Sequence, residues 1–475
     1  MVLSTRERIV AGLFLTALAL SFVLALTNAV PFPSRAFLYD YRAFACAGGI
    51  AGTADDPYRA EPLRTCEHRS GLLAGRKDLA RLAVPAPLPG YAFAPLALLG
   101  RLPGPSGAIL WILLSLLGAV LAVRSLSALA RARARIVWLA LLLPLAVALV
   151  LGQLVPLALG TLCLAALALE RGRFGLAAAA LWVAMIEPHV AFPALLALAL
   201  FVPRARLGVG IGAIVAFVLS LALLGAGKNL EYLAQVLPAH AASELANEEQ
   251  YSLAYLLHRL GAADPWALRI ADFWYLIALA AGLAVARRLV SRGAPHSLYL
   301  LIPAAFAVVG SPFVHIHQIV FIVPALIVVA ARFAPRARAL SLAIVLLAIP
   351  WGAFGLLALA APFVAFAIGM LTYELFGARP LAATLAGLLA AAFVAMLVLE
   401  QSLVPRPDAT AALAPYGDGR LLAEASWTAY MRSSFHENVV VFALAKLPTL
   451  AGVAFGLALV VRAAIVERRP LRTAA

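Results

Sequence analysis

The sequence has few charged and few sulfur-containing side chains. Only 12% of its 475 residues are charged, and it contains three cysteines and five methionines. Soluble domains are about one quarter charged and about half apolar, whereas 64% of this chain is hydrophobic. The apolar stretches are about 15 to 25 residues long, which suits transmembrane helices and excludes barrel strands, disorder and coiled coil. We therefore predict an integral membrane protein of the all-α polytopic class.

Acidic residues are scarcer than basic ones, with 22 Asp and Glu against 37 Lys and Arg. A net charge of +15 would favour a nucleic-acid partner in a soluble protein. Here most arginines lie at the ends of apolar stretches, as the positive-inside rule predicts. The expected partner is the lipid bilayer, and no nucleic acid is expected.

Arginines at both ends of an apolar block place both ends on the same membrane face, so each such block should be a hairpin. The blocks are residues 136–170, 174–203, 294–331 and 339–378. Their midpoints put outer turns at Gly152-Gln153, Glu187-Pro188-His189, Ser311-Pro312 and residues 358–362. Halving the block 174–203 leaves about 15 residues per helix, too short for a hydrocarbon core of about 30 Å. Backbone turns at that depth need a protein or water-filled surrounding, so a cavity that opens outward is expected.

The remaining spans complete a bundle of about 12–14 helices in one membrane domain over residues 1–475. They are residues 9–30, 107–128, 207–226, 269–288, 380–400 and 437–462. The first is expected to be a retained helix and not a cleaved signal peptide, since its apolar run is too long. The segments 31–106, 227–268 and 401–436 are long and polar enough to be periplasmic loops, with both termini in the cytoplasm and the protein in the inner cell membrane.

Cysteine is rare, but Cys46 and Cys66 share the first predicted outer loop, while Cys163 lies in an apolar helix. An oxidising periplasm would allow a disulfide between the two loop cysteines.

Asp40 follows the first predicted helix, in Tyr39-Asp40-Tyr41-Arg42. A carboxylate at a membrane boundary can act as a general base whose pKa responds to burial and to Arg42. The alternative is an N-cap for a stretch at 41–52. Asp56-Pro57-Tyr58 is a turn signature, which alone is a structural feature.

Glu187, His189, His315 and His317 are ionisable groups in otherwise apolar blocks. Each costs a few kcal/mol in a membrane unless it is paired or hydrated, which favours a functional role. Metal binding by His315 and His317 is the alternative, but residues i and i+2 of a helix point to different faces. A hydrogen bond to a phosphate or sugar suits an imidazole better. Neither a metal nor a cofactor is expected.

Arg42, Arg59 and Arg259 fall on the same predicted outer face, which suits an anionic lipid phosphate, although solvated arginines are the alternative. Gln250 and Ser252 lead into an apolar turn that could be a lid or a surface helix.

The order of these pieces resembles glycosyltransferase family 87 over about residues 9–330. The motifs are Asp40, Asp56-Pro57-Tyr58, Tyr91 to Pro95, Gly152-Gln153, Glu187-Pro188, Gln250 to Leu253, and Ser311-Pro312 followed by His317. The resemblance implies a GT-C fold and a mannosyltransferase that uses a polyprenyl-phosphate sugar as donor and a lipid or glycan as acceptor. A loop carboxylate acts as base in that family, and Asp40 is the matching position.

The resemblance also places His317 near the donor phosphate, with His315 replacing an aromatic neighbour. Arg42, Arg59, Arg259, His189, Glu187 and Gln153 are the other candidates on the donor side, and Asp56, Tyr58, Gln250 and Ser252 are those on the acceptor side or in the loops. One departure is that the family usually has Lys-Pro where this chain has Glu187-Pro188. A carboxylate cannot bind phosphate as a lysine does, so the donor sits differently or His189 compensates.

Two other classes fit part of the pattern. A transporter or flippase of lipid-linked glycans would also use broken helices and midplane ionisable residues, but we find no inverted repeat. A membrane scaffold would leave the polar residues at three outer turns unexplained.

Overall fold

The computed structural model describes residues 37–72, 77–102, 105–247, 249–333, 337–348, 361–377, 409–434 and 439–466. Within these ranges the regular elements are helices, joined by two isolated β-bridges. The all-α polytopic class is confirmed. The predicted spans 9–30 and 380–400 and the turn before Ala361 lie outside the described residues, so the predicted helix count is not tested.

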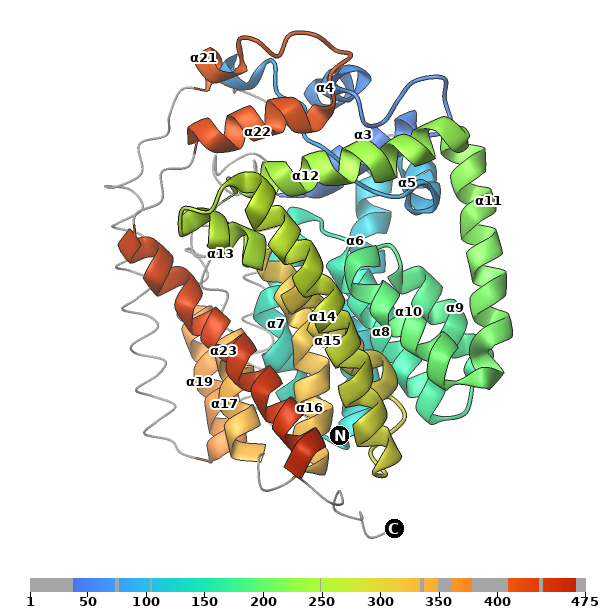
Figure 1. Ribbon diagram of the computed structural model, residues 1–475, viewed down its shortest axis with the longest axis vertical. Coiled ribbons are helices and arrows are strands. Elements are labelled where there is room, and N and C mark those ends of the chain that lie inside the picture. Colours follow the sequence, from blue (N-terminus) through green and yellow to red (C-terminus); the bar gives the residue numbers. More distant parts are fainter. Residues whose placement is uncertain are drawn as a thin grey trace.

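Most helices form a bundle of roughly aligned rods (Figure 1). The bundle contains α6 (Ser106–Ala130), α7 (Ala134–Leu151), α8 (Val155–Glu170), α9 (Phe174–Ala184), α10 (Pro188–Phe201), η3 (Pro203–Ala205), α11 (Arg206–Glu231), α14 (Asp264–Ser291), α15 (Leu298–Gly310), η5 (Ile316–Ile322), α16 (Val323–Arg332), α17 (Ala337–Ala348), α19 (Ala361–Phe376) and α23 (Val439–Val466). Four helices of the described part are long and apolar enough to cross a membrane, and a fifth span exists if the two halves of α7 count as one. The break in α7 is at Pro144, which removes a helical hydrogen bond.

Three of the predicted hairpins are present. Helices α7 and α8 meet at Gly152-Gln153, α9 and α10 meet at Glu187, and α15 is followed by η5 after Ser311-Pro312. The helices α9 and α10 of the block 174–203 have 11 and 14 residues and are thus as short as predicted, and α8 and α15 have 16 and 13 residues. Their turns therefore lie part-way along the bundle and not at its end.

The predicted outer loops fold into a layer of helices across one end of the bundle, which we call the cap (Figure 1). The cap comprises α3 (Tyr39–Ile50), α4 (Ala60–Arg69), η1 (Lys77–Leu79), η2 (Gly90–Ala92), α5 (Phe93–Gly100), η4 (Tyr232–Val236), α12 (Leu237–Glu244), α13 (Leu253–Arg259), α21 (Thr410–Leu413) and α22 (Ala423–Ser434). The first and third loops are joined by a backbone hydrogen bond of 2.8 Å from Ala60 to Leu421. The cap is thus one structure made from segments distant in sequence.

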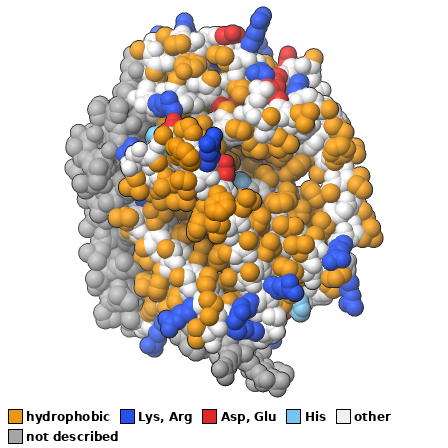
Figure 2. Space-filling view, in the orientation of Figure 1, with side chains coloured by type: hydrophobic (Ala, Val, Ile, Leu, Met, Phe, Trp, Pro, Cys, Tyr) orange, Lys and Arg blue, Asp and Glu red, His pale blue; other side chains and the backbone are white. Residues whose placement is uncertain are grey.

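On the face shown in Figure 2 the surface of the bundle is largely apolar. The charged side chains at the end opposite the cap are mostly basic, whereas the cap carries both basic and acidic ones. Helix α11 exposes Leu207, Ile211, Ile214 and Phe217, which are 54–76% exposed. Such a belt requires a hydrocarbon surrounding.

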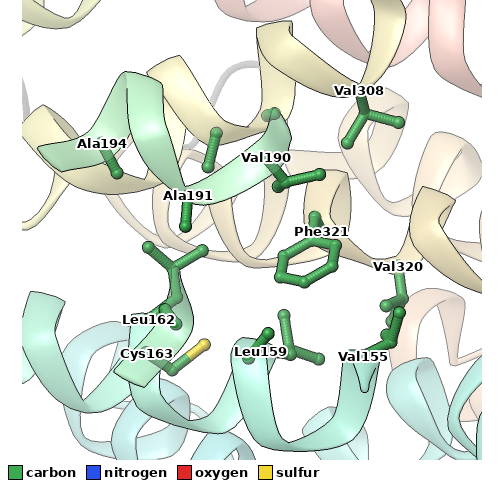
Figure 3. Close-up of a cluster of buried hydrophobic side chains, with 14 of the residues drawn as sticks. Val155, Leu159, Leu162, Cys163, Val190, Ala191, Ala194, Val308, Val320 and Phe321 are labelled. Atoms are coloured by element: carbon green, nitrogen blue, oxygen red, sulfur yellow. The ribbon is translucent and has the colours of Figure 1, made fainter. Parts of the chain in front are cut away.

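A fully buried apolar cluster joins the three hairpins (Figure 3). Val155, Leu159 and Leu162 of α8 face Val190 and Ala191 of α10 and Phe321 of η5. These apolar side chains are closely packed between the three hairpins, which fixes the positions of the polar residues at the turns.

Candidate active site

Three turns lie part-way along the bundle, after α7, α9 and α15, and we call them the membrane turns. A cavity of about 890 Å³ lies where these turns meet the cap. Its walls come from α3, the stretch 84–91, the turns after α7, α9 and α15, the segment from η4 to α12, α14 and α22. The residues on these walls with polar side-chain groups are Asp40, Tyr91, Gln153, Glu187, His189, Tyr232, His240, Glu244, Asp272, Tyr275, His315, His317, Gln318 and Trp427. The cavity that the short helices predict is therefore present, and four predicted site residues of the turns line it together with Asp40 and Gln153.

Asp40 is the second residue of α3, and the helix begins directly after Leu38, whose φ of 55° turns the chain into it. Leu38 is the residue that precedes the helix, so Asp40 is not the N-cap considered as an alternative. The carboxylate Oδ2 accepts a 2.6 Å hydrogen bond from Nε2 of Gln153. Burial raises the pKa of Asp40 to about 7, while the Gln153 hydrogen bond and the charge of His315 oppose this shift. At neutral pH this carboxyl can take up or release a proton.

Gln153 is held in place by the shape of the turn after α7. Gly152 has a φ of 75°, a conformation that favours glycine, and its carbonyl accepts a 3.0 Å hydrogen bond from Nε1 of Trp111. A side chain at Gly152 would also overlap Tyr41 of α3. The glycine thus lets the turn approach the helix that carries Asp40.

The turn between α15 and η5 places two histidines in the cavity. The backbone N–H of His315 donates to Oε1 of Gln318 at 2.9 Å, and Nε2 of Gln318 donates to Oε2 of Glu187 at 3.3 Å. The rings of His315 and His317 stack with centroids 5.3 Å apart. Nδ1 of His317 is buried and has no hydrogen-bond partner among the described residues. His317 therefore offers a polar atom to a ligand.

Glu244 of α12 is the centre of a hydrogen-bond network that the sequence did not predict. Its carboxylate accepts from Nδ2 of Asn247 at 2.7 Å and from Nε1 of Trp427 at 3.2 Å. Nε2 of His315 lies 3.2 Å from its Oε2. Glu244 thereby connects the second loop, the third loop and the turn with the two histidines.

His240, Glu244 and Trp427 all line the cavity, but none of them was among the predicted site residues. His240 and Glu244 are four residues apart on one helix, so they share a face. This spacing in the second outer loop was the available signal. Trp427 lies in the third outer loop, and no motif marked it.

The other predicted residues do not line the cavity. Arg42 donates to the carbonyl of Gly71 at 3.2 Å, and Arg59 pairs with Asp56 and Glu231. Arg259 is exposed at the end of α13. In the described ranges the cavity wall contains neither lysine nor arginine.

The predicted loop residues have structural contacts. Tyr58 is buried and donates to the carbonyl of Leu88 at 2.7 Å, while Asp56 accepts from the backbone of Tyr58 at 3.0 Å. Gln250 contacts Nε2 of His315 at 2.9 Å, and Ser252 is the N-cap of α13. The segment considered as a lid or surface helix is the seven-residue helix α13.

Cys46 and Cys66 form a disulfide between α3 and α4, and Cys163 is free and buried. No cluster of three or more His, Cys, Asp or Glu in the described ranges could hold a metal ion.

One side of the cavity is apolar and open to the surface of the bundle. Phe192, Leu233 and Leu276 line the cavity and are 43%, 62% and 60% exposed. Figure 2 shows the face hollowed below α12, with hydrophobic side chains around the hollow. The cavity thus has a polar inner end and an apolar mouth within the lipid-facing belt.

The model of glycosyltransferase family 87 matches residues 86–312. The matched region belongs to glycosyltransferase family 87. The predicted family resemblance is confirmed, and the chain is a multi-pass membrane glycosyltransferase. No curated protein and no solved structure gives a significant match to the chain.

The family 87 region contains Gln153, Glu187, His189 and Glu244. Asp40 precedes this region, and His315 and His317 follow it. The cavity of this glycosyltransferase is therefore completed by residues on both sides of the matched region.

Proposed function

We propose that this glycosyltransferase moves a sugar, mannose or another hexose or pentose, from a polyprenyl-phosphate donor to a lipid or glycan acceptor, with Asp40 as general base. The observation that carries the proposal is the position of Asp40. Its carboxylate lies at the polar end of the cavity, fixed by Gln153, with a pKa raised to about 7 by burial. A base whose pKa is near the working pH is partly ionised and still able to accept a proton.

The shape of the cavity supports a lipid-linked donor. The exposed apolar side chains Phe192, Leu233 and Leu276 suit a polyprenyl chain that enters from the bilayer. The polar end, with Asp40 and the histidines, suits the sugar and its phosphate. A nucleotide sugar has no apolar tail and would gain nothing from such a mouth.

The reaction follows from this arrangement. The oxygen of the acceptor hydroxyl forms a bond to the anomeric carbon of the donor sugar, and Asp40 accepts the proton that this hydroxyl loses. The bond from that carbon to the phosphate oxygen breaks, its electron pair stays on the phosphate, and the configuration at the carbon inverts. His317 faces the cavity and is the candidate to donate a hydrogen bond to the phosphate as its charge grows.

Arginines play a smaller part in this proposal than the sequence suggested. Arg42 donates to Gly71 within the cap, and Arg59 pairs with Asp56 of the cap and with Glu231 at the end of α11. Glu187 accepts from Gln318 of η5. Glu187 occupies the position where the family resemblance expects a lysine, and in this proposal His317 takes over the hydrogen bond to the donor phosphate.

We also propose that the cap and the cavity face the periplasm or the exterior of the inner cell membrane, with both termini in the cytoplasm. The charged side chains at the opposite end of the bundle are mostly basic (Figure 2), as expected for a cytoplasmic face. Cysteine accessibility to a membrane-impermeant reagent at the exposed cap residue Asp55 and the opposite-end residue Arg204 tests this orientation.

The function is tested by transfer of radiolabelled sugar from polyprenyl-phosphate mannose, and then from other polyprenyl-phosphate sugars, to a membrane lipid extract. We expect transfer by the wild type and a loss of about 100- to 10,000-fold in Asp40→Asn, the usual contribution of a general base. The matched control is Asp55→Asn, since Asp55 is exposed and outside the cavity wall.

Normal turnover by a folded Asp40→Asn protein would show that Asp40 is not the base. Failure of the wild type to transfer from every donor of this panel would contradict the donor assignment.

A further inference from the structure

Two carboxylate–imidazole pairs lie beside the ring of Phe313 in the cavity. The rings of His189 and His240 each lie with their centroids 5.1 Å from that of Phe313. His189 lies in the first turn of α10 and His240 lies in α12, so the two pairs come from different parts of the chain. All three rings line the cavity.

In each pair one ring nitrogen faces a carboxylate. Nδ1 of His189 lies 3.8 Å from Oε2 of Glu187, and Nε2 of His240 lies 3.9 Å from Oε1 of Glu244. A carboxylate favours the proton on the nitrogen that faces it. The opposite nitrogen then carries a lone pair and accepts hydrogen bonds.

Those opposite nitrogens are the unusual feature. Nε2 of His189 and Nδ1 of His240 are buried and have no hydrogen-bond partner within the described ranges. His240 as a whole is only 7% exposed. A buried polar atom without a partner costs free energy, and a bound ligand that donates a hydrogen bond removes this cost.

The lone pairs identify the class of ligand group. Phosphate ester oxygens only accept hydrogen bonds, so they cannot pair with an unprotonated nitrogen. A hydroxyl group donates one, and a sugar presents several hydroxyls around one ring. Two acceptors that both lie next to Phe313 can therefore engage two hydroxyls of the same sugar.

We propose that the open nitrogens of His240 and His189 accept hydrogen bonds from hydroxyl groups of the transferred sugar and so determine which sugar is used. The proposal rests on the proposed function, in which that sugar arrives on a polyprenyl phosphate. Glu187 and Glu244 are positioning residues, because they act by fixing which imidazole nitrogen carries the proton.

The experiment compares polyprenyl-phosphate mannose with its 2-, 3-, 4- and 6-deoxy analogues in wild type, His240→Phe and His189→Phe. A site built to pair with a hydroxyl rejects the analogue that lacks it. We expect the wild type to lose at least about tenfold in kcat/KM with one deoxy donor for each histidine, about 1.4 kcal/mol. His240→Phe should transfer the parent sugar and one of these analogues equally well, and His189→Phe should do so for a different analogue.

Phenylalanine keeps an aromatic ring beside Phe313. His296→Phe is the matched control, since His296 is exposed and is not part of the cavity wall. It should reproduce the wild-type preference among the donors. His240→Asn, which returns a polar group close to the position of Nδ1, should restore part of the discrimination.

Equal use of all deoxy donors by the wild type would overturn the proposal. This comparison needs no variant, so the proposal can be tested even if a variant folds poorly. A uniform loss across all donors in both Phe variants, with discrimination unchanged, would also overturn it and would indicate binding of the phosphate. Both results leave the proposed function standing, whereas an absence of transfer from any polyprenyl-phosphate sugar overturns the function and this proposal together.

Discussion

Nε2 of Gln153 lies 2.6 Å from Oδ2 of Asp40, although the two residues are 113 positions apart in the chain. The bond connects the cap to the membrane turn after α7. It also acts on the chemistry of Asp40, because a hydrogen bond to a carboxylate stabilises its charged form and lowers its pKa. Burial acts in the opposite direction and is the larger effect, so that the pKa is about 7.

The first prediction concerns the pH dependence of transfer. Asp40 must be ionised to accept a proton, so kcat/KM of the wild type should fall as the pH drops below about 7. Gln153→Leu removes the hydrogen bond that favours the ionised form, so the pKa should rise and the acid limb of the profile should move to higher pH. Gln235→Leu is the control, since Gln235 is exposed on η4. An unchanged profile in Gln153→Leu would contradict the role assigned to this bond.

The positions of the membrane turns could be predicted from the sequence, and the reason is electrostatic. Arginines stay on the cytoplasmic side, so a block bracketed by them must turn back near its middle. This located Gln153, Glu187 and the turn before His315 within a residue or two. Because the resulting helices are short, it also predicted that these turns meet a cavity.

The contribution of the cap could not be predicted in the same way. His240, Glu244 and Trp427 lie in outer loops, where neither hydrophobic periodicity nor the arginine pattern fixes how segments pack. Their positions depend on contacts between loops distant in sequence, such as the bond from Trp427 to Glu244. Arg59 was a candidate for binding a lipid phosphate because it falls on the predicted outer face. Its guanidinium instead pairs with two carboxylates of the protein.

The second prediction concerns the contact between α6 and α8. A Cβ atom at Gly160 would overlap the backbone of Gly118, which cannot move as a side chain can. Small residues allow helices to approach in this way within membranes. Gly160→Ala should lower the free energy of unfolding by about 1–3 kcal/mol. It should also reduce transfer, because α8 begins just after Gln153 and a shift of this helix would move the Gln153 side chain. Gly210→Ala, which meets no atom within 4 Å, should leave both unchanged.

The third prediction concerns the disulfide between Cys46 and Cys66, which are 20 residues apart. Closing a loop of this size stabilises a fold by about 3 kcal/mol through the unfolded state. We expect reductant to lower the melting temperature of the wild type and of Cys163→Ala equally, while Cys46→Ser/Cys66→Ser melts at the lower temperature with or without reductant. A double variant that melts like the oxidised wild type would show that the bond does not stabilise the cap.

The last prediction concerns Glu67 of α4, which is buried in the cap and accepts hydrogen bonds of 3.0 and 3.2 Å from the backbone N–H of Val84. Val84 begins the stretch that lines the cavity. Burial raises the pKa of Glu67 to about 8, although the Val84 hydrogen bond and Arg64 lower it. The unfolded chain has the ordinary value of about 4.5, so between these two values the folded state binds more protons than the unfolded state.

Linkage then requires the stability to fall as the pH rises from about 4.5 to about 8, by at most about 1.4 kcal/mol per pH unit. Glu67→Gln keeps an oxygen for Val84 and removes the titrating proton, so it should abolish this part of the slope and be more stable than the wild type at pH 8. Glu61→Gln is the matched control on the same helix, where the side chain is 40% exposed. Thermal unfolding at pH 5, 6, 7 and 8 measures how the stability of each protein changes with pH. If the stability of the wild type rises with pH and that of Glu67→Gln rises in parallel, Glu67 is ionised in the folded protein and the prediction is wrong.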